Sequence, residues 1–193
     1  MRYLILRNAW IMEMAYHVKS VDKNHLVEAG LEGFYGRSTP LRMKLNPCSE
    51  IGTGFIANNL IPAIDFSKQS IHILINCNYH VNFKGTRNSS SKSRSLAQRS
   101  HSRHEIHPPK VGHWLDAHIR DAEYVLQNPI IVANFGKSRK DPSSNTYKRD
   151  QLFDIGYHKL YTSAKGGAAA SGSMFWQLLS EGMDSFRDGY ELY

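Results

Sequence analysis

Short apolar runs alternate with amphipathic helical stretches along most of this 193-residue chain, and this alternation limits the possible folds. The clearest unit has apolar residues at helical spacing from Trp114 to Leu126, then Asn128-Pro129, then four apolar residues over 130–133. A short, continuously apolar run of this kind is typical of a strand buried on both faces of a parallel sheet. The pattern predicts an α/β protein in which helices cross between parallel strands.

The same alternation extends to both sides of this unit. Apolar spacing predicts further helices, the first with Asn8 as its N-cap, over 8–21, 52–60 and 147–164. Extended apolar runs predict strands over 26–31, over 64–66 resuming at 71–74, and over 172–178. This order fits a barrel and a Rossmann-like sheet equally well. The glycine motifs G-x-G-x-x-G and G-x-x-x-x-G-K-[ST], which bind nucleotides between a strand and a helix, are both missing from such positions. Nucleotide binding therefore gains no support.

Residues 68–111 interrupt the pattern with a basic segment rich in serine and histidine. Eight Lys and Arg residues face one acid there, Glu105, and this imbalance accounts for the whole net charge of +7. The polar, aperiodic composition predicts a loop or disorder. Its cations favour salt-dependent contacts with phosphates, but Tyr79 and Phe83 are its only aromatic residues, which weighs against nucleic acid as the partner. Three histidines recur from His101 to His107 without the further ligands that a metal site needs.

The composition is that of a globular domain, with 41% hydrophobic residues. No run of about 18 apolar residues occurs, so we expect no membrane-spanning helix. The apolar stretch within residues 1–7 is shorter than a secretory signal requires, and we expect no signal peptide in this chain. A complete (β/α)8 barrel typically needs about 250 residues, which exceeds the length of this chain.

Five stretches resemble the plant endo-β-1,4-mannanases of glycoside hydrolase family 5, in the order and spacing of barrel strands five to eight. They are Leu31–Gly36, Gly52–Asn59, Trp114–Ile119, Ile131–Ser138 and Phe175–Leu179. The resemblance implies an α/β fold that is a partial (β/α)8 TIM barrel, formed by strands five to eight with their helices. Residues 1–193 would then form a single incomplete glycoside hydrolase domain, with 68–111 as an unmatched segment.

The resemblance also implies a retaining hydrolysis of internal β-1,4-mannosidic bonds by two glutamates that flank the scissile bond. The family's nucleophile follows strand seven in a Val-Ala-Glu-Phe-Gly-Lys-Ser context, and Asn134 stands at that position here. An amide carries no negative charge and is a very poor nucleophile. The acid/base glutamate belongs to an Asn-Glu-Pro motif that this sequence does not contain. We therefore expect a truncated, inactive form of the enzyme.

Two residues match the family's sugar contacts. His72 matches the histidine of a His-x-Tyr-Pro motif, although Leu74 replaces the tyrosine, and Trp176 matches the tryptophan that stacks on the sugar. The family uses no metal or organic cofactor, binds mannan-type polysaccharides, and acts outside the cell or in the cell wall. The alternative prediction is a non-catalytic fragment that binds carbohydrate through Trp176 or nucleic acid through the basic segment.

Overall fold

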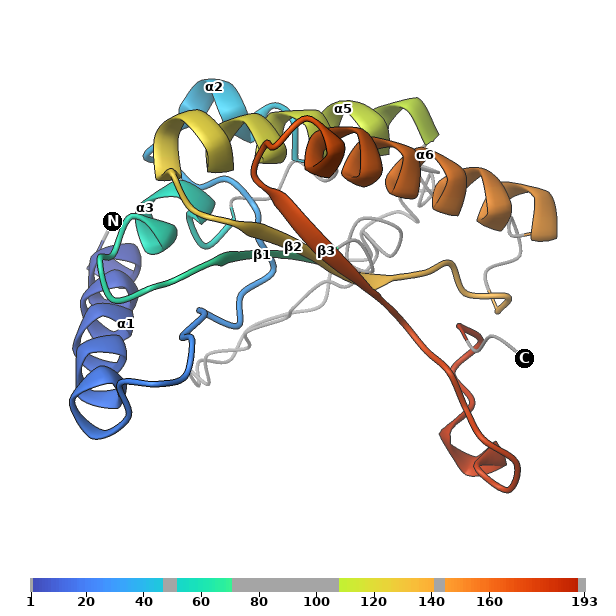
Figure 1. Cartoon of the computed structure of the whole chain (residues 1–193), viewed down its shortest axis with the longest axis horizontal. Helices are drawn as coiled ribbons and strands as arrows, with labels where there is room; N and C mark the ends of the chain where they lie inside the picture. Colours follow the sequence, from blue (N-terminus) through green and yellow to red (C-terminus); the bar gives the residue numbers. More distant parts are fainter. Residues whose placement is uncertain (1, 47–51, 71–107, 141–144, 191–193) are drawn as a thin grey trace, which may run out of the picture.

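A computed structural model of the chain describes residues 2–46, 52–70, 108–140 and 145–190. The described residues contain a three-stranded parallel sheet in the order β1-β2-β3 (Figure 1). Its strands are β1 (Ser67–Ser70), β2 (Ile130–Phe135) and β3 (Ala170–Phe175). Because the strands are parallel, their carboxyl ends lie at the same edge of the sheet.

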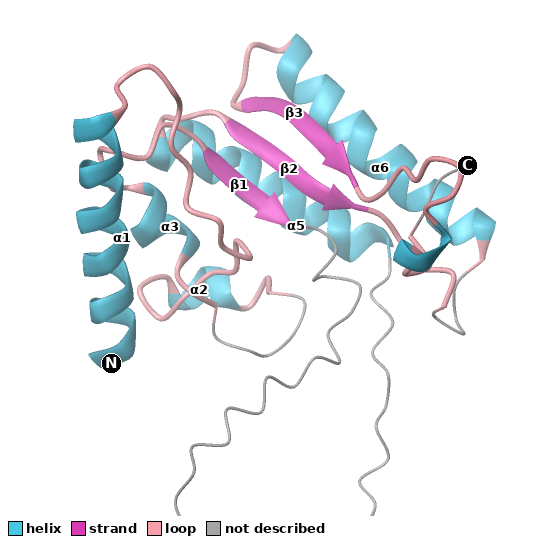
Figure 2. Cartoon of the chain, turned by 90° about the horizontal axis from the view of Figure 1, so that it is seen from below, coloured by secondary structure: helices cyan, strands magenta, loops and turns pink. Residues whose placement is uncertain are grey.

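Helices lie on one face of this sheet and beside it. They are α1 (Arg2–Val21), α2 (Pro40–Met43), α3 (Phe55–Asn59), α5 (Pro108–Asp121) and α6 (Thr146–Lys165), with a π-helical turn η1 (Ala122–Leu126) and a 3-10 turn η2 (Asp184–Phe186). The long helices α5 and α6 cover one face, and α1 lies on the β1 side (Figure 2). No described helix covers the other face. This arrangement, a curved parallel sheet with helices outside, is that of a partial (β/α)8 barrel.

The main hydrophobic core fills the space between the sheet and the outer helices. Ile130 and Val132 of β2 are fully buried there, together with Trp114 and Leu115 of α5. Apolar side chains suit these positions of β2, because the helices shield them from water. A second cluster packs α1 against residues 61–64 through Ile11 and Ala15.

The predicted alternation of helices and parallel strands is confirmed. The helix predicted over 147–164 is α6, whose first turn is capped by Asn145, because its Oδ1 accepts a hydrogen bond of 2.8 Å from the Lys148 N–H. The apolar run over 130–133 is the first part of β2, the central strand of the sheet. The predicted helix over 52–60 is confirmed in the shorter form of α3.

The prediction of a strand over 26–31 is wrong, because its backbone groups bond in other ways. The Val27 N–H donates to the Asp65 carboxylate at 2.6 Å instead of to a carbonyl group. The Leu31 N–H turns back to the Ala29 carbonyl oxygen, also at 2.6 Å. The segment lies beside the chain that leads into β1, since the Asp65 N–H donates to the Val27 carbonyl oxygen.

The first described strand also differs from the prediction. Apolar residues led us to expect extended structure over 64–66 and again from residue 71, but β1 is the polar stretch Ser67–Ser70 between them. Its Ser67, Gln69 and Ser70 are buried nevertheless. A periodicity rule that looks for apolar residues overlooks a strand of this composition. Residues 71–74 lie outside the described part.

The prediction that 68–111 forms one loop or disordered segment is wrong at both ends. Residues 68–70 belong to β1, where Lys68 pairs with Glu28 at 3.3 Å, and residues 108–111 form the first turn of α5. Residues 71–107 are outside the described part, so the prediction for them is untested.

Asn8 is not the N-cap of the first helix, because α1 already begins at Arg2. Its side-chain amide instead donates to the Ala57 carbonyl oxygen at 2.9 Å and to the Asn58 Oδ1 at 3.1 Å, which joins α1 to α3. Ile11 and Ala15 of this helix are buried, whereas Trp10 is 61% exposed.

Candidate functional site

Asn134 lies at the carboxyl end of β2, in a local irregularity of the sheet. The register with β3 shifts between Val132 and Phe135, and Asn134 itself has a φ of +52°. A bulge of this kind turns a side chain out of the regular alternation, and such bulges are frequent beside active sites. Asparagine is among the few residues that adopt the left-handed conformation readily. The Asn134 side chain is half-buried, and its Nδ2 donates to Ser70 Oγ of β1 at 3.0 Å.

Trp176 follows directly after the carboxyl end of β3. The predicted strand over 172–178 is observed over Ala170–Phe175, so the tryptophan stands in the loop instead of within the sheet. A cis peptide bond joins it to Gln177. The residue is 42% exposed, and its Nε1–H donates to Asp188 Oδ2 at 2.7 Å. The polar edge of the ring is thus occupied, while much of its surface is open to solvent.

The chain segments that carry these two residues touch each other beyond the strands. A Cβ atom at Gly136 would lie only 2.4 Å from the Trp176 carbonyl oxygen and 3.2 Å from the Tyr190 ring. Glycine is required here because the backbones approach so closely. Asn134, near the end of β2, and Trp176, directly after β3, therefore lie at the same, carboxyl edge of the sheet.

Residues 184–190 hold these two loops together. The Ser138 hydroxyl donates to the Asp188 carbonyl oxygen at 3.2 Å, and the Arg139 N–H donates to the Gly189 carbonyl oxygen at 2.7 Å. On the other side, Gln177 Nε2 donates to the Phe186 carbonyl oxygen at 3.2 Å. Residues 184–190 form the carboxyl-edge clamp, because they bind the loop after β2 and the loop after β3 at once.

The clamp brings a charged carboxylate beside the indole. Partial burial tends to raise the pKa of Asp188, but hydrogen bonds from the Trp176 indole and the Tyr190 backbone outweigh it and lower the pKa below its usual value. Asp188 is therefore ionised at neutral pH. A general acid of a glycosidase needs the opposite, a carboxyl group with a raised pKa.

His72 is the other sequence-predicted sugar contact, and Glu32 is a further carboxylate that the structure describes. His72 lies outside the described residues, so its role as a sugar contact stays a prediction. Glu32 Oε1 accepts the Thr53 N–H at 2.7 Å and thereby ties the loop before α3 to the segment after residue 31. Sequence reasoning missed Ser70 because the polar strand β1 was missed. It missed Asp188 because a single aspartate in a polar loop carries no spacing signal.

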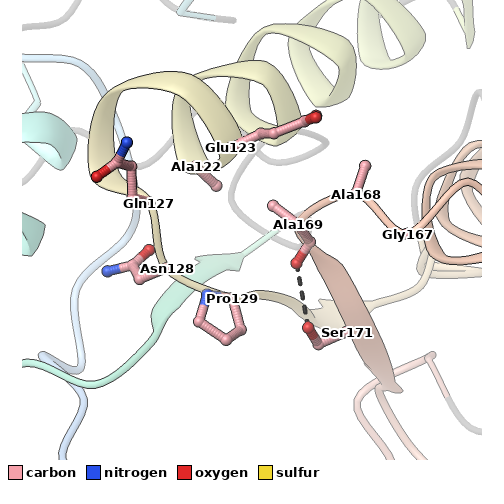
Figure 3. A pocket seen from close by; sticks show the side chains of 9 residues that line it. All are labelled: Ala122, Glu123, Gln127, Asn128, Pro129, Gly167, Ala168, Ala169 and Ser171. Atoms are coloured by element: carbon pink, nitrogen blue, oxygen red, sulfur yellow. Dashed lines mark hydrogen bonds between the residues drawn. The ribbon is translucent and has the colours of Figure 1, made fainter.

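A hollow lies at the opposite, amino ends of β2 and β3 (Figure 3). Its volume is about 310 Å³, and its lining includes Gln127, Pro129 and Ser171, the last bonded through its hydroxyl to the Ala169 carbonyl oxygen. No lining residue is aromatic, and Glu123 is the only ionisable one. In parallel α/β barrels this end contributes to stability, whereas function belongs to the carboxyl ends. We therefore place the candidate site at Asn134 and Trp176.

The described part of the chain contains no group of three or more His, Cys, Asp or Glu side chains arranged to hold a metal. None of its helices combines the length and the apolar character needed to cross a membrane.

Comparisons with known proteins extend the sequence resemblance. No protein-family model matches the chain. "Mannan endo-1,4-beta-mannosidase 7" of Arabidopsis thaliana is 48% identical over 182 residues, which are 94% of this chain and 37% of the relative. "Mannan endo-1,4-beta-mannosidase 1" of Oryza sativa subsp. japonica is 45% identical over 186 residues, 95% of this chain and 38% of the relative. Alignments of this extent run across residues 68–111.

Solved structures agree on the fold. An endo-beta-1,4-mannanase from Thermotoga petrophila matches with a TM-score of 0.61 and 18% identity, over 98% of this chain and 37% of its own. The endo-1,4-beta-mannanase of Rhizomucor miehei matches with a TM-score of 0.56 and 20% identity, over 98% of this chain and 41% of its own. The chain spans less than two fifths of the length of the two plant relatives named above. Over that part, the chain is a homologue of the plant mannan endo-1,4-beta-mannosidases and has the corresponding part of a mannanase barrel.

Proposed function

We propose that this chain binds β-1,4-linked mannan at the carboxyl ends of β2 and β3, without hydrolysing it through the residues it carries. The proposal rests on the position of Asn134 and Trp176 at the same edge of the sheet. The mannanase resemblance puts the nucleophile and the sugar-stacking ring at these two positions. The names of the plant relatives support mannan as the polysaccharide.

The chemistry of the edge favours binding over catalysis. A 42% exposed indole offers a flat apolar surface to a pyranose ring, and burial of such a ring stabilises a complex strongly. Asn134 offers an uncharged amide that donates to Ser70. A retaining glycosidase needs two carboxyl groups about 5 Å apart, one of them protonated before the reaction. Asp188, the carboxylate beside the indole, has a lowered pKa and is ionised at neutral pH.

Gel retardation in galactomannan tests the proposal. We expect the mobility of the chain to fall as the polysaccharide concentration rises, with little dependence on salt, because stacking contributes more than charge. Trp176→Ala should weaken binding by roughly thirtyfold, the loss typical of an aromatic residue at the centre of an interface. Trp10→Ala is the matched control, since Trp10 is also an exposed tryptophan but lies on α1.

Three outcomes separate the alternatives. Retardation that Trp176→Ala abolishes and Trp10→Ala preserves supports the proposed site. Retardation in nucleic acid instead, fading as salt rises, would favour the basic segment 68–111. No retardation in galactomannan would contradict the proposed function. A His72→Ala variant in the same gels tests the second predicted sugar contact.

The proposal includes a location. By resemblance to the plant enzymes, the chain acts in the extracellular space or cell wall of a plant, where a mannan ligand would be accessible. Immunodetection in wall extracts and in cell lysates tests this, and detection in the lysate alone would contradict it.

A further inference from the structure

The polar edge of the Trp176 indole is held by a hydrogen bond. Its nitrogen, the ring's one polar atom, donates to Asp188 Oδ2 at 2.7 Å. A hydrogen bond to a carboxylate is about twice as strong as one between neutral groups. The bond restrains the ring at its edge, and 42% of the residue is still exposed.

Asp188 is itself held by the surrounding backbone. Its Oδ1 accepts the Tyr190 N–H at 3.0 Å, so each carboxylate oxygen has its own donor. Its carbonyl oxygen accepts the Ser138 hydroxyl at 3.2 Å, which connects it to the loop after β2. The aspartate thus links the ring that follows β3 to the segment that follows Asn134.

We propose that Asp188 is a positioning residue for mannan binding, which holds the Trp176 ring in the orientation that a sugar requires. This inference rests on the proposed function. A free tryptophan side chain at a loop samples several rotamers, and ordering it on binding costs free energy that a preformed ring avoids. Asp188 acts through the indole and touches no sugar in this scheme.

A double-mutant cycle of Asp188→Ala and Trp176→Phe tests the inference. Phenylalanine keeps a flat ring but has no N–H for the carboxylate. We expect Asp188→Ala to weaken galactomannan retardation by about three- to tenfold in the wild-type background. In the Trp176→Phe background the same change should have almost no further effect, because the bond is already absent. An equal loss in both backgrounds would overturn the inference, since Asp188 would then act by another route.

Two further variants test whether the loss of binding comes from Asp188 itself or from a general disturbance of the clamp. Asp184→Ala removes a different aspartate of the clamp, which is exposed and pairs with Arg187, and this variant should bind as the wild type does. Asp188→Asn keeps one oxygen as an acceptor for the indole and should bind with intermediate affinity. If Asp184→Ala matches the loss seen in Asp188→Ala, the clamp as a whole is responsible and the inference fails.

Hydrogen exchange of the Trp176 indole N–H, followed by NMR, gives a readout that needs no sugar. Faster exchange in Asp188→Ala than in wild type supports the inference that Asp188 restrains the ring. Unchanged exchange overturns this inference. If the wild-type chain is not retarded in galactomannan while the exchange rate responds to Asp188, the proposed function fails and the hydrogen bond stands. The two failures are therefore distinguishable.

Discussion

At the residue scale, the decisive side chain is Asn134. It stands where the mannanase resemblance puts a nucleophilic glutamate, in the bulge that ends β2, with a hydrogen bond to Ser70. An amide can accept or donate hydrogen bonds to sugar hydroxyls, but it does not form a glycosyl ester at a useful rate. The change from a glutamate to an asparagine thus separates binding from catalysis at a single residue.

Restoring the carboxylate alone is expected to leave the chain inactive. Asn134→Glu supplies the attacking group, but the reaction also needs a protonated acid for the leaving oxygen, and the ionised Asp188 does not supply it. We expect the release of reducing ends from galactomannan to equal that of the size-matched Asn134→Gln control. Turnover by Asn134→Glu above this control would contradict the assignment.

Acid is expected to destabilise the chain through His118. Its fully buried ring has carbonyl oxygens of Trp114 and Gly33 at 2.8 and 2.9 Å from its two nitrogens, and only a protonated ring donates to both. Burial has the larger effect, lowers the pKa of His118 from 6.5 to about 4, and keeps the ring neutral at pH 7. The positive charge of nearby Arg42 also lowers the pKa of His118.

The sign of this pH dependence follows from where each state takes up its proton. The unfolded chain binds the proton near pH 6.5 and the folded chain only near pH 4, so the free energy of unfolding falls as the pH drops between these values. The full change is on the order of 3 kcal/mol. Urea unfolding at pH 7 and pH 4.5, compared between wild type and His118→Gln, measures it. The same pH slope in both proteins would contradict the assignment to His118.

At the element scale, the outer helices support the edge that carries the site. Helix α5 packs its fully buried Trp114 and Leu115 toward the sheet, and Lys159 of α6 binds the Asp116 carboxylate of α5 with two contacts of 2.7 Å. This pair is partly exposed, so packing contributes more to stability than charge does.

The N-cap of α6 contributes measurably to the stability of the folded chain. Asn145→Ala removes the side-chain acceptor of the Lys148 N–H at the helix start and should lower the free energy of unfolding by about 1 kcal/mol. Asn145→Ser keeps a capping oxygen, so its free energy of unfolding should stay close to that of the wild type. Thermal unfolding of the three proteins measures the difference. An alanine variant as stable as the serine variant would show that the cap contributes nothing.

The elements also differ in how far the sequence predicts them. The apolar run of β2 and the spacing of α6 predicted their positions closely, because their side chains pack into a core that requires that pattern. The polar strand β1 gave no such signal, since backbone pairing with β2 holds it in place. Trp176 was expected inside a strand, yet it follows one, and its partner Asp188 becomes its neighbour only through tertiary structure.

At the scale of the whole molecule, the described sheet is open. Strand β2 has two neighbours, whereas β1 and β3 each have one among the described strands, and one face of the sheet has no described helix over it (Figure 2). In a complete barrel every strand edge is paired. Unpaired edges and exposed apolar side chains are the usual sites of self-association.

We therefore expect these 193 residues, expressed alone, to self-associate or aggregate. Exposed apolar side chains that would contribute include Val21 on α1 and Leu178 after β3, at 76% and 67% exposure. Sedimentation velocity across a range of concentrations measures the effect, and we expect the mean mass to rise with concentration. A single monomeric species at every concentration would contradict this expectation.

Saturation-transfer NMR of mannopentaose mixed with the chain tests the central claim most directly, because one sample reports both binding and hydrolysis. We predict transfer from the protein to the sugar protons, reduced by Trp176→Ala, with no new anomeric signals from shorter oligosaccharides over a day. New anomeric signals, or the absence of transfer, would contradict a mannan site that binds without cleaving.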